Sequence, residues 1–251
     1  METADKILLS RINDIFRLCE KYSCERFSPF LDGGEIAVIE DNMHFPYGFN
    51  TMYFGGFEGS ERKMIGVFPE WSEADGALFP ISVIRVKCTF SAELTHRDYL
   101  GSLLSLGIDR SKMGDIVVDT PQSAYCFVCS DIAKYICDNL HKIGNKGVTV
   151  EEIGLDEVKT VSHKFTRLEL VCASMRADAV VGAITRLSRQ KAAELIASGK
   201  VKINHRVIAD NSKPVKENDL ISIRGFGRFV MRGEGAKTRK DRLHISVDKY
   251  V

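Results

Sequence analysis

The chain has 251 residues, of which 44% are apolar and 27% charged, the composition of an ordinary globular protein. No apolar run approaches the roughly 20 residues that span a bilayer. The N-terminal stretch METADKILLSRINDIF carries acidic residues and no continuous apolar core, so no secretory signal is predicted. Seven cysteines, an odd number without regular spacing, favour a reducing compartment over a disulfide framework, so we expect a cytoplasmic protein without a membrane partner.

The net charge of +1 conceals a strong asymmetry between two parts of the chain. Residues 159–251 contain 20 Lys/Arg and 9 Asp/Glu, a net of +11, whereas residues 1–158 contain 15 Lys/Arg and 25 Asp/Glu, a net of −10. Such an asymmetry is typical of a nucleic-acid-binding module joined to another domain. The charge distribution therefore predicts nucleic-acid binding by the C-terminal part.

Residues 1–75 are predicted to form a small N-terminal α+β domain. Apolar residues at helical spacing predict a helix over 4–22, and a second helix is expected over 32–44. Strands are predicted over 49–54 and 62–68, on either side of the glycine-rich segment GGFEGSERK. This segment lacks the spacing of a nucleotide-binding P-loop, and a hairpin turn is favoured over a phosphate contact.

Residues 76–173 are predicted to form a central domain of the split β-α-β-β-α-β type. Its strands are expected over 82–90, 115–119, 124–129 and 148–153, with helices beginning near Thr95 and Asp131. A further alternating strand over 164–172 is expected to join this domain.

RNA-recognition modules share this central fold, although the fold alone does not establish RNA binding. An RNA-binding sheet of this class presents aromatic side chains on which bases stack. Phe90, Tyr125 and Phe127 could form such a surface, but core packing is the favoured interpretation.

A second candidate RNA contact lies around the first helix of the central domain. Thr95 and Asp98 resemble a capping box at its start. The basic side chains at the start of this helix and after its end are His96, Arg97, Arg110 and Lys112. A well-capped helix with solvated charges explains the same residues equally well, and both interpretations stay open.

Neither a metal site nor a catalytic centre is predicted. Cys126 and Cys129 form a lone CxxC pair whose members should point to opposite faces of a strand, and no second pair follows at zinc-site spacing. No nucleophile, acid–base pair or cofactor loop stands out. We therefore expect a protein without enzymatic activity, metal or cofactor.

The C-terminal part is organised around the stretch TRLSRQKAAELIASGKVKINHRV, residues 185–207. Ser188 can cap a helix, Ala192 and Ile196 lie on its apolar stripe, and Gly199 can end it in the left-handed conformation. A strand then begins at Val201. Basic residues around this helix–turn–strand unit predict a surface that faces phosphate.

The pattern S-R-x-x-A-x-x-L-I-x-x-G-x-V-x-I-N in this stretch resembles the S4 RNA-binding domain. The resemblance extends upstream to Arg176-Ala177-Asp178, where Ala177 replaces the usual Leu, and downstream to residues 219–223, DLISI. Residues 95–116, with GGFEGSERK at 55–63 and RGFGRF at 224–229, are similar to the YlmH family of bacterial S4-domain proteins.

This resemblance implies an α+β chain with three parts: a small N-terminal α/β region, a central RRM-like domain and, over residues 174–251, an S4 domain with additional strands. Together with the charge pattern, it predicts RNA binding by Arg176, Ser188, Arg189, Lys191, Lys202, Asn204, His205, Arg206, Lys213, Arg224 and Arg228. The implied partners are rRNA of the large ribosomal subunit, tRNA or peptidyl-tRNA, and ribosome quality-control factors, bound by a monomer. The implied role is to help hold peptidyl-tRNA on an obstructed subunit in ribosome-associated quality control.

Two other classes of function stay open. An RNA-modifying enzyme, with the acidic half as its catalytic domain, would show a deep pocket with converging polar side chains there. The known S4-bearing pseudouridine synthases and methyltransferases would need a second G-R-L-D-type aspartate or a Rossmann glycine motif, and neither is found. A protein–protein adaptor linked to cell division would bind a protein through residues 1–158 without RNA.

Overall fold

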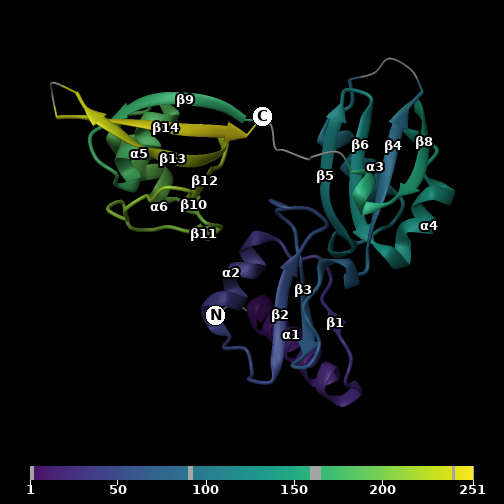
Figure 1. Ribbon diagram of the computed structural model, residues 1–251. Coiled ribbons are helices and arrows are strands. Elements are labelled where there is room, and N and C mark those ends of the chain that lie inside the picture. The colour runs from purple at the N-terminus through teal and green to yellow at the C-terminus, as the bar shows by residue number, and fades with distance from the viewer. Residues whose placement is uncertain (1–2, 90–92, 159–164, 239–240, 251) are drawn as a thin grey trace. The chain divides into compact units, whose positions relative to one another are not determined.

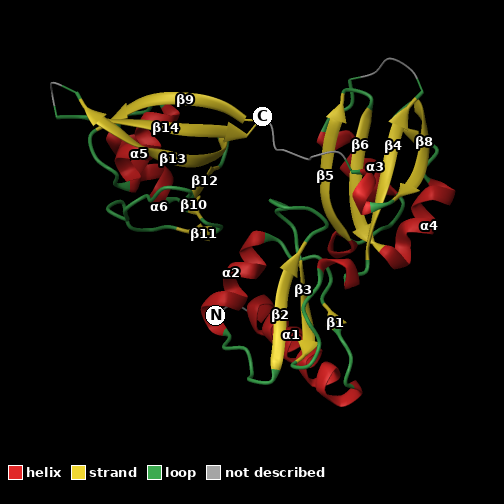
Figure 2. Cartoon of the chain, in the orientation of Figure 1, coloured by secondary structure: helices red, strands yellow, loops and turns green. Residues whose placement is uncertain are grey.

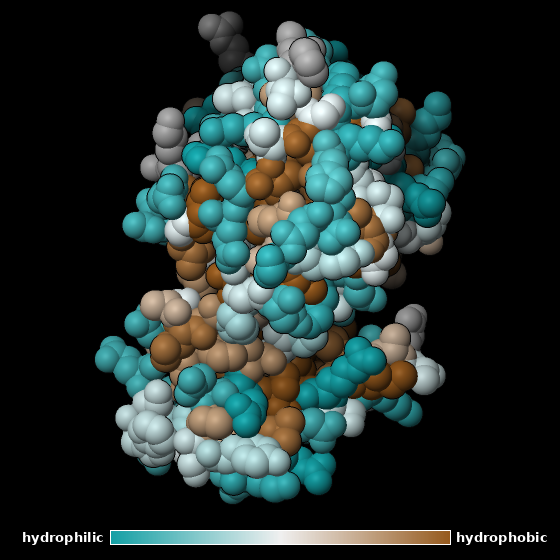
Figure 3. Space-filling model, turned by 90° about the vertical axis from the view of Figure 1, so that its right-hand side faces the viewer, coloured by the Kyte–Doolittle hydropathy of each residue, from teal (hydrophilic) through white to brown (hydrophobic). Residues whose placement is uncertain are grey.

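The computed structural model describes residues 3–89, 93–158, 165–238 and 241–250. The α+β chain divides into two compact units, Met1–Ser162 and His163–Val251 (Figure 1). No helix within the described ranges is both long and apolar enough to cross a membrane. On the face drawn in Figure 3, hydrophobic residues form patches among hydrophilic ones.

The first unit begins with a helical layer on a small sheet. Helix α1 (Thr3–Tyr22) is followed by strand β1 (Arg26–Phe27) and helix α2 (Gly33–Asn42), and strands β2 (Phe49–Phe54) and β3 (Met64–Pro69) complete the sheet in the order β1-β3-β2. Asp32 and Glu35 form a capping box at the start of α2. Ile12 and Phe16 of α1 are buried in one cluster with Ile65 and Val67 of β3. The helices and strands predicted for this region are confirmed.

The rest of the first unit has the predicted split β-α-β-β-α-β order. Its elements are β4 (Ile81–Cys88), α3 (His96–Ser105), β5 (Met113–Thr120), β6 (Ser123–Cys129), α4 (Ser130–Asn139), β7 (Lys142–Ile143) and β8 (Lys146–Ile153). The strands pair antiparallel in the order β5-β6-β4-β8-β7. Tyr99 and Leu103 of α3 and Ile136 of α4 pack with Ile84 of β4, so the two helices cover one face of this sheet (Figure 2).

The N-terminal region covers apolar residues on the other face of the central sheet. Phe30 and Phe68 of the N-terminal region and Phe79, just before β4, are buried in one cluster with Tyr125 and Phe127. Tyr125 is 3% exposed and Phe127 is 0% exposed. These two rings are therefore core residues, as favoured by the sequence, and are not presented for base stacking. Phe90 lies outside the described residues.

The glycine-rich segment between β2 and β3 also holds the two regions together. The Arg62 guanidinium donates to the backbone carbonyls of Met113, Phe30 and Arg110, at 2.9, 3.0 and 3.3 Å. The Asp115 carboxylate accepts from the backbone N–H groups of Glu61 and Arg62, at 2.6 and 3.1 Å. The predicted hairpin connection is confirmed, because β2 and β3 pair antiparallel, and Arg62 binds backbone carbonyls within the unit.

The second unit is a single six-stranded sheet with two helices on one face. Its elements are β9 (Phe165–Cys172), α5 (Ala177–Thr185), α6 (Arg189–Ala197), β10 (Val201–Ile203), β11 (Arg206–Val207), β12 (Leu220–Ile223), β13 (Gly227–Lys237) and β14 (Leu243–Tyr250). The strand order is β11-β10-β12-β13-β14-β9. Val181 of α5 and Ile196 of α6 pack into one core with Ile221 and Val247 of the sheet (Figure 2).

The predicted assignment of strand 164–172 to the central domain is wrong. Strand β9 pairs antiparallel with β14 along its whole length, from Phe165 opposite Tyr250 to Cys172 opposite Leu243. Its alternation correctly indicates one apolar face, which packs Leu168 and Leu170 into the core of the second unit. Alternation defines the faces of a strand but does not identify its neighbour, and here the neighbour comes from the end of the chain.

A matched pair of glycine substitutions tests the packing between the N-terminal region and the central sheet. A Cβ at Gly114 would lie 2.6 Å from the Phe30 ring, whereas a Cβ at Gly101, within α3, meets nothing within 4 Å. We expect Gly114→Ala to destabilise the first unit by about 1–3 kcal/mol through overpacking. Gly101→Ala should instead stabilise it by about 0.5–1 kcal/mol, because alanine is the better helix former. Urea unfolding of both variants measures the difference, and equal stabilities would contradict the described contact.

Candidate nucleic-acid interface

The helix–turn–strand unit expected from the sequence is present in the second unit. The Ser188 hydroxyl accepts from the backbone N–H of Lys191 at 3.3 Å and caps α6. Gly199 follows the helix with φ +66°, and Asn204 and His205 make a left-handed turn between β10 and β11, with φ +48° and +66°. The Asn204 side chain donates to Asp219 at 2.8 Å and accepts from the backbone N–H of Leu220 at 2.9 Å. Asn204 thus anchors the turn to β12.

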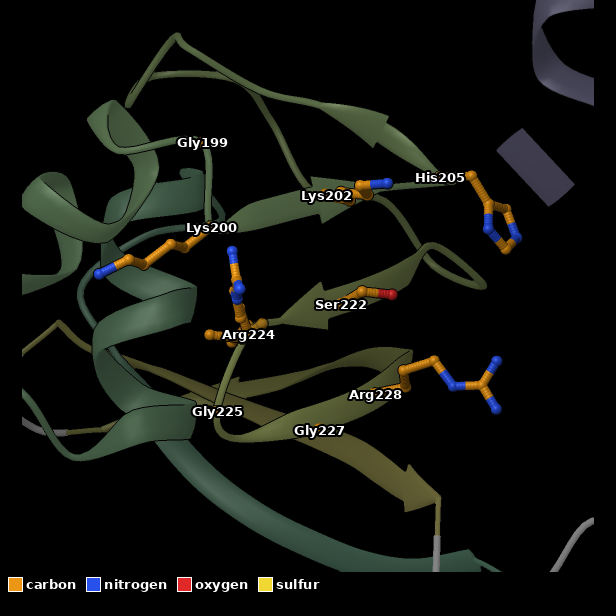
Figure 4. Close-up of a pocket in the computed structure, with 10 residues that line it drawn as sticks. Gly199, Lys200, Lys202, His205, Ser222, Arg224, Gly225, Gly227 and Arg228 are labelled. Atoms are coloured by element: carbon orange, nitrogen blue, oxygen red, sulfur yellow. The ribbon is translucent and has the colours of Figure 1, made fainter. Parts of the chain in front are cut away.

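A basic groove of about 540 Å³ lies along the ends of β10, β12 and β13 (Figure 4). Its polar and charged lining residues are Lys200, Lys202, His205, Ser222, Arg224 and Arg228, and no acidic residue is among its described lining. We call this site the basic groove.

The strand register explains why these side chains converge. Lys202 lies opposite Ser222, and Ser222 lies opposite Arg228, so the three share one face of three neighbouring strands. The backbone N–H of Arg224 donates to the Lys200 carbonyl at 2.9 Å and fixes the hairpin turn beside the start of β10. Gly225, with φ +90°, permits that turn. Cations separated in the sequence therefore line one continuous surface.

A second basic site surrounds a buried carboxylate at the starts of α5 and α6. The Asp178 side chain is 6% exposed and accepts from Arg189 Nε at 2.8 Å and from Arg176 Nε at 3.3 Å. Burial alone would raise the pKa of Asp178, but the hydrogen bonds from Arg189 and then Arg176 outweigh it and hold the pKa below its ordinary value. Asp178 links the two helices and fixes both arginines, of which the Arg189 side chain is 63% exposed.

The remaining predicted residues of the second unit lie outside the basic groove. Arg206 and Lys213 line a separate hollow of about 340 Å³ together with Lys216 and the Asn204–Asp219 pair. The Lys213 carbonyl accepts from the backbone N–H of Ala177, so this hollow adjoins the start of α5. Lys191 lies exposed on the first turn of α6. The predicted set therefore occupies three neighbouring places rather than one.

Among the described cations that line the basic groove, Lys200 was not predicted. Lys200 lies between the C-cap glycine and β10, and it lines the groove beside Lys202. The alternation Lys200-Val201-Lys202, with Val201 buried in the core, is the signal that could have identified it.

The structure does not assemble the second candidate RNA contact. His96 and Arg97 are exposed at the start of α3, whereas Arg110 and Lys112 follow the end of that helix. Arg110 Nη1 donates to the carbonyls of Met113 and Gly114, at 2.7 and 3.1 Å, and Lys112 pairs with Asp131 at 2.5 Å. The two pairs lie at the two ends of α3, and Arg110 binds backbone carbonyls within the unit, so an RNA contact by these four residues stays a prediction.

The CxxC cysteines have the opposite orientations expected for a strand. Cys126 lies in the core beneath α3 and α4, and Cys129 lies in the cluster on the other face of the sheet. Burial raises the pKa of Cys126 to about 12 and that of Cys129 to about 11, so both thiols are protonated at neutral pH. Within the described ranges, no three His, Cys, Asp or Glu side chains are grouped so as to hold a metal ion.

Comparison with known proteins gives two family matches. Residues 76–157 match a family model described as "Putative RNA-binding domain in YlmH", and residues 175–221 match the S4 domain. The chain is 32% identical to the "Ribosome-associated protein quality control protein P2" of Bacillus subtilis (strain 168) over 234 residues, which cover 93% of this chain and 90% of that protein.

A solved structure, "Cell division protein ylmH from Streptococcus pneumoniae", is also similar to the chain. It aligns with a TM-score of 0.50 and 23% identity, and the alignment covers 63% of this chain and 97% of the other. This similarity concerns the fold alone.

The Asp178 link between α5 and α6 can be tested through its pH dependence. Asn at position 178 keeps the shape but loses the charge, so we expect Asp178→Asn to cost the second unit about 1–3 kcal/mol at pH 7. Because the pKa of Asp178 is lower in the folded state, the extra free energy of unfolding of the wild type over Asp178→Asn is fully present above the unfolded pKa of about 4. It disappears as pH falls through the folded pKa.

Urea unfolding from pH 7 down to pH 3, with hydrogen exchange of α5 and α6 as the local probe, measures this difference. Asp138→Asn is the matched control, because Asp138 forms an exposed pair with Lys134 on α4. This substitution should change the free energy of unfolding by less than about 0.5 kcal/mol. A loss for Asp178→Asn that does not change with pH would contradict the assigned charge interaction.

Proposed function

Because the chain belongs to the YlmH family, we propose that it is a non-catalytic RNA-binding protein that occupies the large ribosomal subunit. Its second unit contacts rRNA or tRNA through the basic groove and the arginines at the starts of α5 and α6. Its role is to help hold peptidyl-tRNA on an obstructed subunit during ribosome-associated quality control. The name of the Bacillus subtilis relative supports the association with the ribosome and with quality control.

The observation that carries the proposal is the convergence of cations in the basic groove. Lys200, Lys202, Arg224 and Arg228 line it, and none of its described lining residues is acidic. Phosphate contacts by Lys and Arg release counterions, and this release supplies much of the affinity for RNA. The charge of +11 over residues 159–251 extends the attraction beyond the groove.

The Asp178 site adds a second phosphate contact with defined geometry. Arg189 follows the Ser188 cap, and the free N–H groups at the start of α6 favour anions there. Asp178 holds Arg189 through Nε and fixes the direction of its exposed guanidinium. A preorganised arginine loses less conformational entropy when it binds a phosphate.

A protein of this kind acts by occupancy rather than by turnover. The groove and the Asp178 site can contact different parts of one RNA, or an rRNA helix and a bound tRNA. Two linked contacts raise the apparent affinity when both can be made at once. We therefore expect tighter binding to large subunits that carry peptidyl-tRNA than to empty ones.

Sedimentation of the full chain with loaded and empty subunits, over a series of salt concentrations, tests this function. The triple variant Lys200→Gln/Lys202→Gln/Arg224→Gln should bind at least about tenfold more weakly. Its slope of log affinity against log salt concentration should be shallower by about 2–3. Lys134→Gln, an exposed lysine on α4, is the matched control and should bind as the parent does.

Two outcomes would contradict different parts of the proposal. Equal affinity of the parent for loaded and empty subunits at one salt concentration would leave a general rRNA binder without the quality-control role. Unchanged affinity and salt slope in the triple variant would remove the basic groove from the interface.

A further inference from the structure

The face of the C-terminal sheet opposite α5 and α6 carries a cluster of two aromatic rings and two arginines. Phe165 of β9 lies opposite Tyr250 of β14, and their ring centres are 4.8 Å apart at an angle of 72°. The Arg228 guanidinium lies over the Tyr250 ring at 4.6 Å, and that of Arg232 lies over the Phe165 ring at 5.4 Å. We call these four residues the aromatic–arginine cluster.

The cluster is presented on the surface rather than packed in the core. The neighbours that point into the core from β9 are Leu168 and Leu170, and Phe165 alternates with them on the other face. Phe165 is 37% exposed, and Tyr250 is partly exposed. In the first unit, by contrast, Tyr125 and Phe127 lie beneath the N-terminal region.

A buried carboxylate fixes one side of the cluster. Asp248 accepts from Arg232 Nε at 2.7 Å and from Arg167 Nε at 3.0 Å, and its side chain is 8% exposed. Hydrogen bonds from Arg167 and then Arg232 hold the pKa of Asp248 below its ordinary value, so the carboxylate stays ionised at neutral pH. The guanidinium of Arg232 is therefore held in place beside Phe165.

The cluster continues directly from the basic groove. Lys202, Ser222 and Arg228 lie in one row across β10, β12 and β13, and Tyr250 and Phe165 extend that row across β14 and β9. Arg228 belongs to both sites, because it lines the groove and covers the Tyr250 ring. At about 4.8 Å per strand, the row spans roughly 19 Å, enough for several nucleotides of single-stranded RNA.

We propose that the aromatic–arginine cluster binds unpaired nucleobases of the RNA whose phosphates occupy the basic groove. Unstacked bases bind on aromatic rings and on guanidinium planes, and the cluster offers both beside a cationic track. Bases within a duplex are already stacked on each other, so the cluster selects RNA with an unpaired segment next to a helix. This inference rests on the proposed RNA-binding function and adds the kind of RNA that is bound.

The test compares two RNA probes, a hairpin with a single-stranded extension and the same hairpin with a blunt end. Binding of the full chain is measured by fluorescence anisotropy at one salt concentration. The parent should prefer the extended hairpin. Tyr250→Leu, which keeps apolar bulk but removes the ring, should weaken binding of the extended hairpin by at least about fivefold and weaken binding of the blunt hairpin by much less, because only the position of Arg228 in the groove is affected.

Two further variants separate stacking from a structural effect. Tyr250→Phe retains the ring and should keep the parent's preference for the extended hairpin. Tyr135→Leu, an exposed tyrosine on α4 of the first unit, is the matched control and should also bind as the parent does. Circular dichroism confirms that each variant is folded.

The outcomes distinguish this inference from the function on which it rests. If the parent binds neither probe, the proposed RNA-binding function fails and this inference fails with it. If the parent binds both probes equally, or if Tyr250→Leu weakens both equally or neither, RNA binding stands and the aromatic–arginine cluster has no role in reading unpaired bases.

Discussion

The packing of phenylalanines onto the face of the central sheet opposite α3 and α4 determines which aromatic residues of the first unit reach solvent. The sheet is apolar on both faces: α3 and α4 cover one, and Phe30, Phe68 and Phe79 pack onto the other. A sheet with two apolar faces is stable only when both are covered. Here that cover removes Tyr125 and Phe127 from solvent, and with them the surface on which an RNA-recognition module of this topology stacks bases.

The second unit has the opposite arrangement. Its helices cover one face of a six-stranded sheet, and the other face carries arginines and the partly exposed rings of Phe165 and Tyr250. Strands β9 and β14 extend the sheet beyond the residues that match the S4 domain, 175–221. The cations of the S4 region and the aromatic residues of the added strands thereby lie in one row. The acidic first unit therefore covers both faces of its central sheet, whereas the basic second unit leaves one face of its sheet exposed.

Much of the local structure could be predicted because it depends on nearby residues. The Ser188 cap, the left-handed Gly199 and the faces of β9 follow from capping, backbone sterics and alternation, which act over a few positions. The family resemblance also correctly indicated the YlmH family and the S4 domain.

The errors arose where long-range contacts decide. The neighbour of β9 is β14 at the far end of the chain, and no short-range pattern identifies it. A charged residue looks the same in a sequence whether it faces water or backbone carbonyls. Predicting which residues line the basic groove likewise requires the strand register, because only the pairing of β10, β12 and β13 brings Lys200 and Arg228 together.

The most direct test of this account is to map the protein–RNA crosslinks of the full chain bound to large ribosomal subunits. Ultraviolet irradiation followed by mass spectrometry of RNA-linked peptides identifies the residues in contact. We expect crosslinks in the peptides that contain residues 199–206 and 222–230, and none in the peptide that contains Tyr125 and Phe127. Crosslinks concentrated on β6, the strand that contains Tyr125 and Phe127, with none in the second unit, would contradict the assignment of RNA binding to the C-terminal sheet.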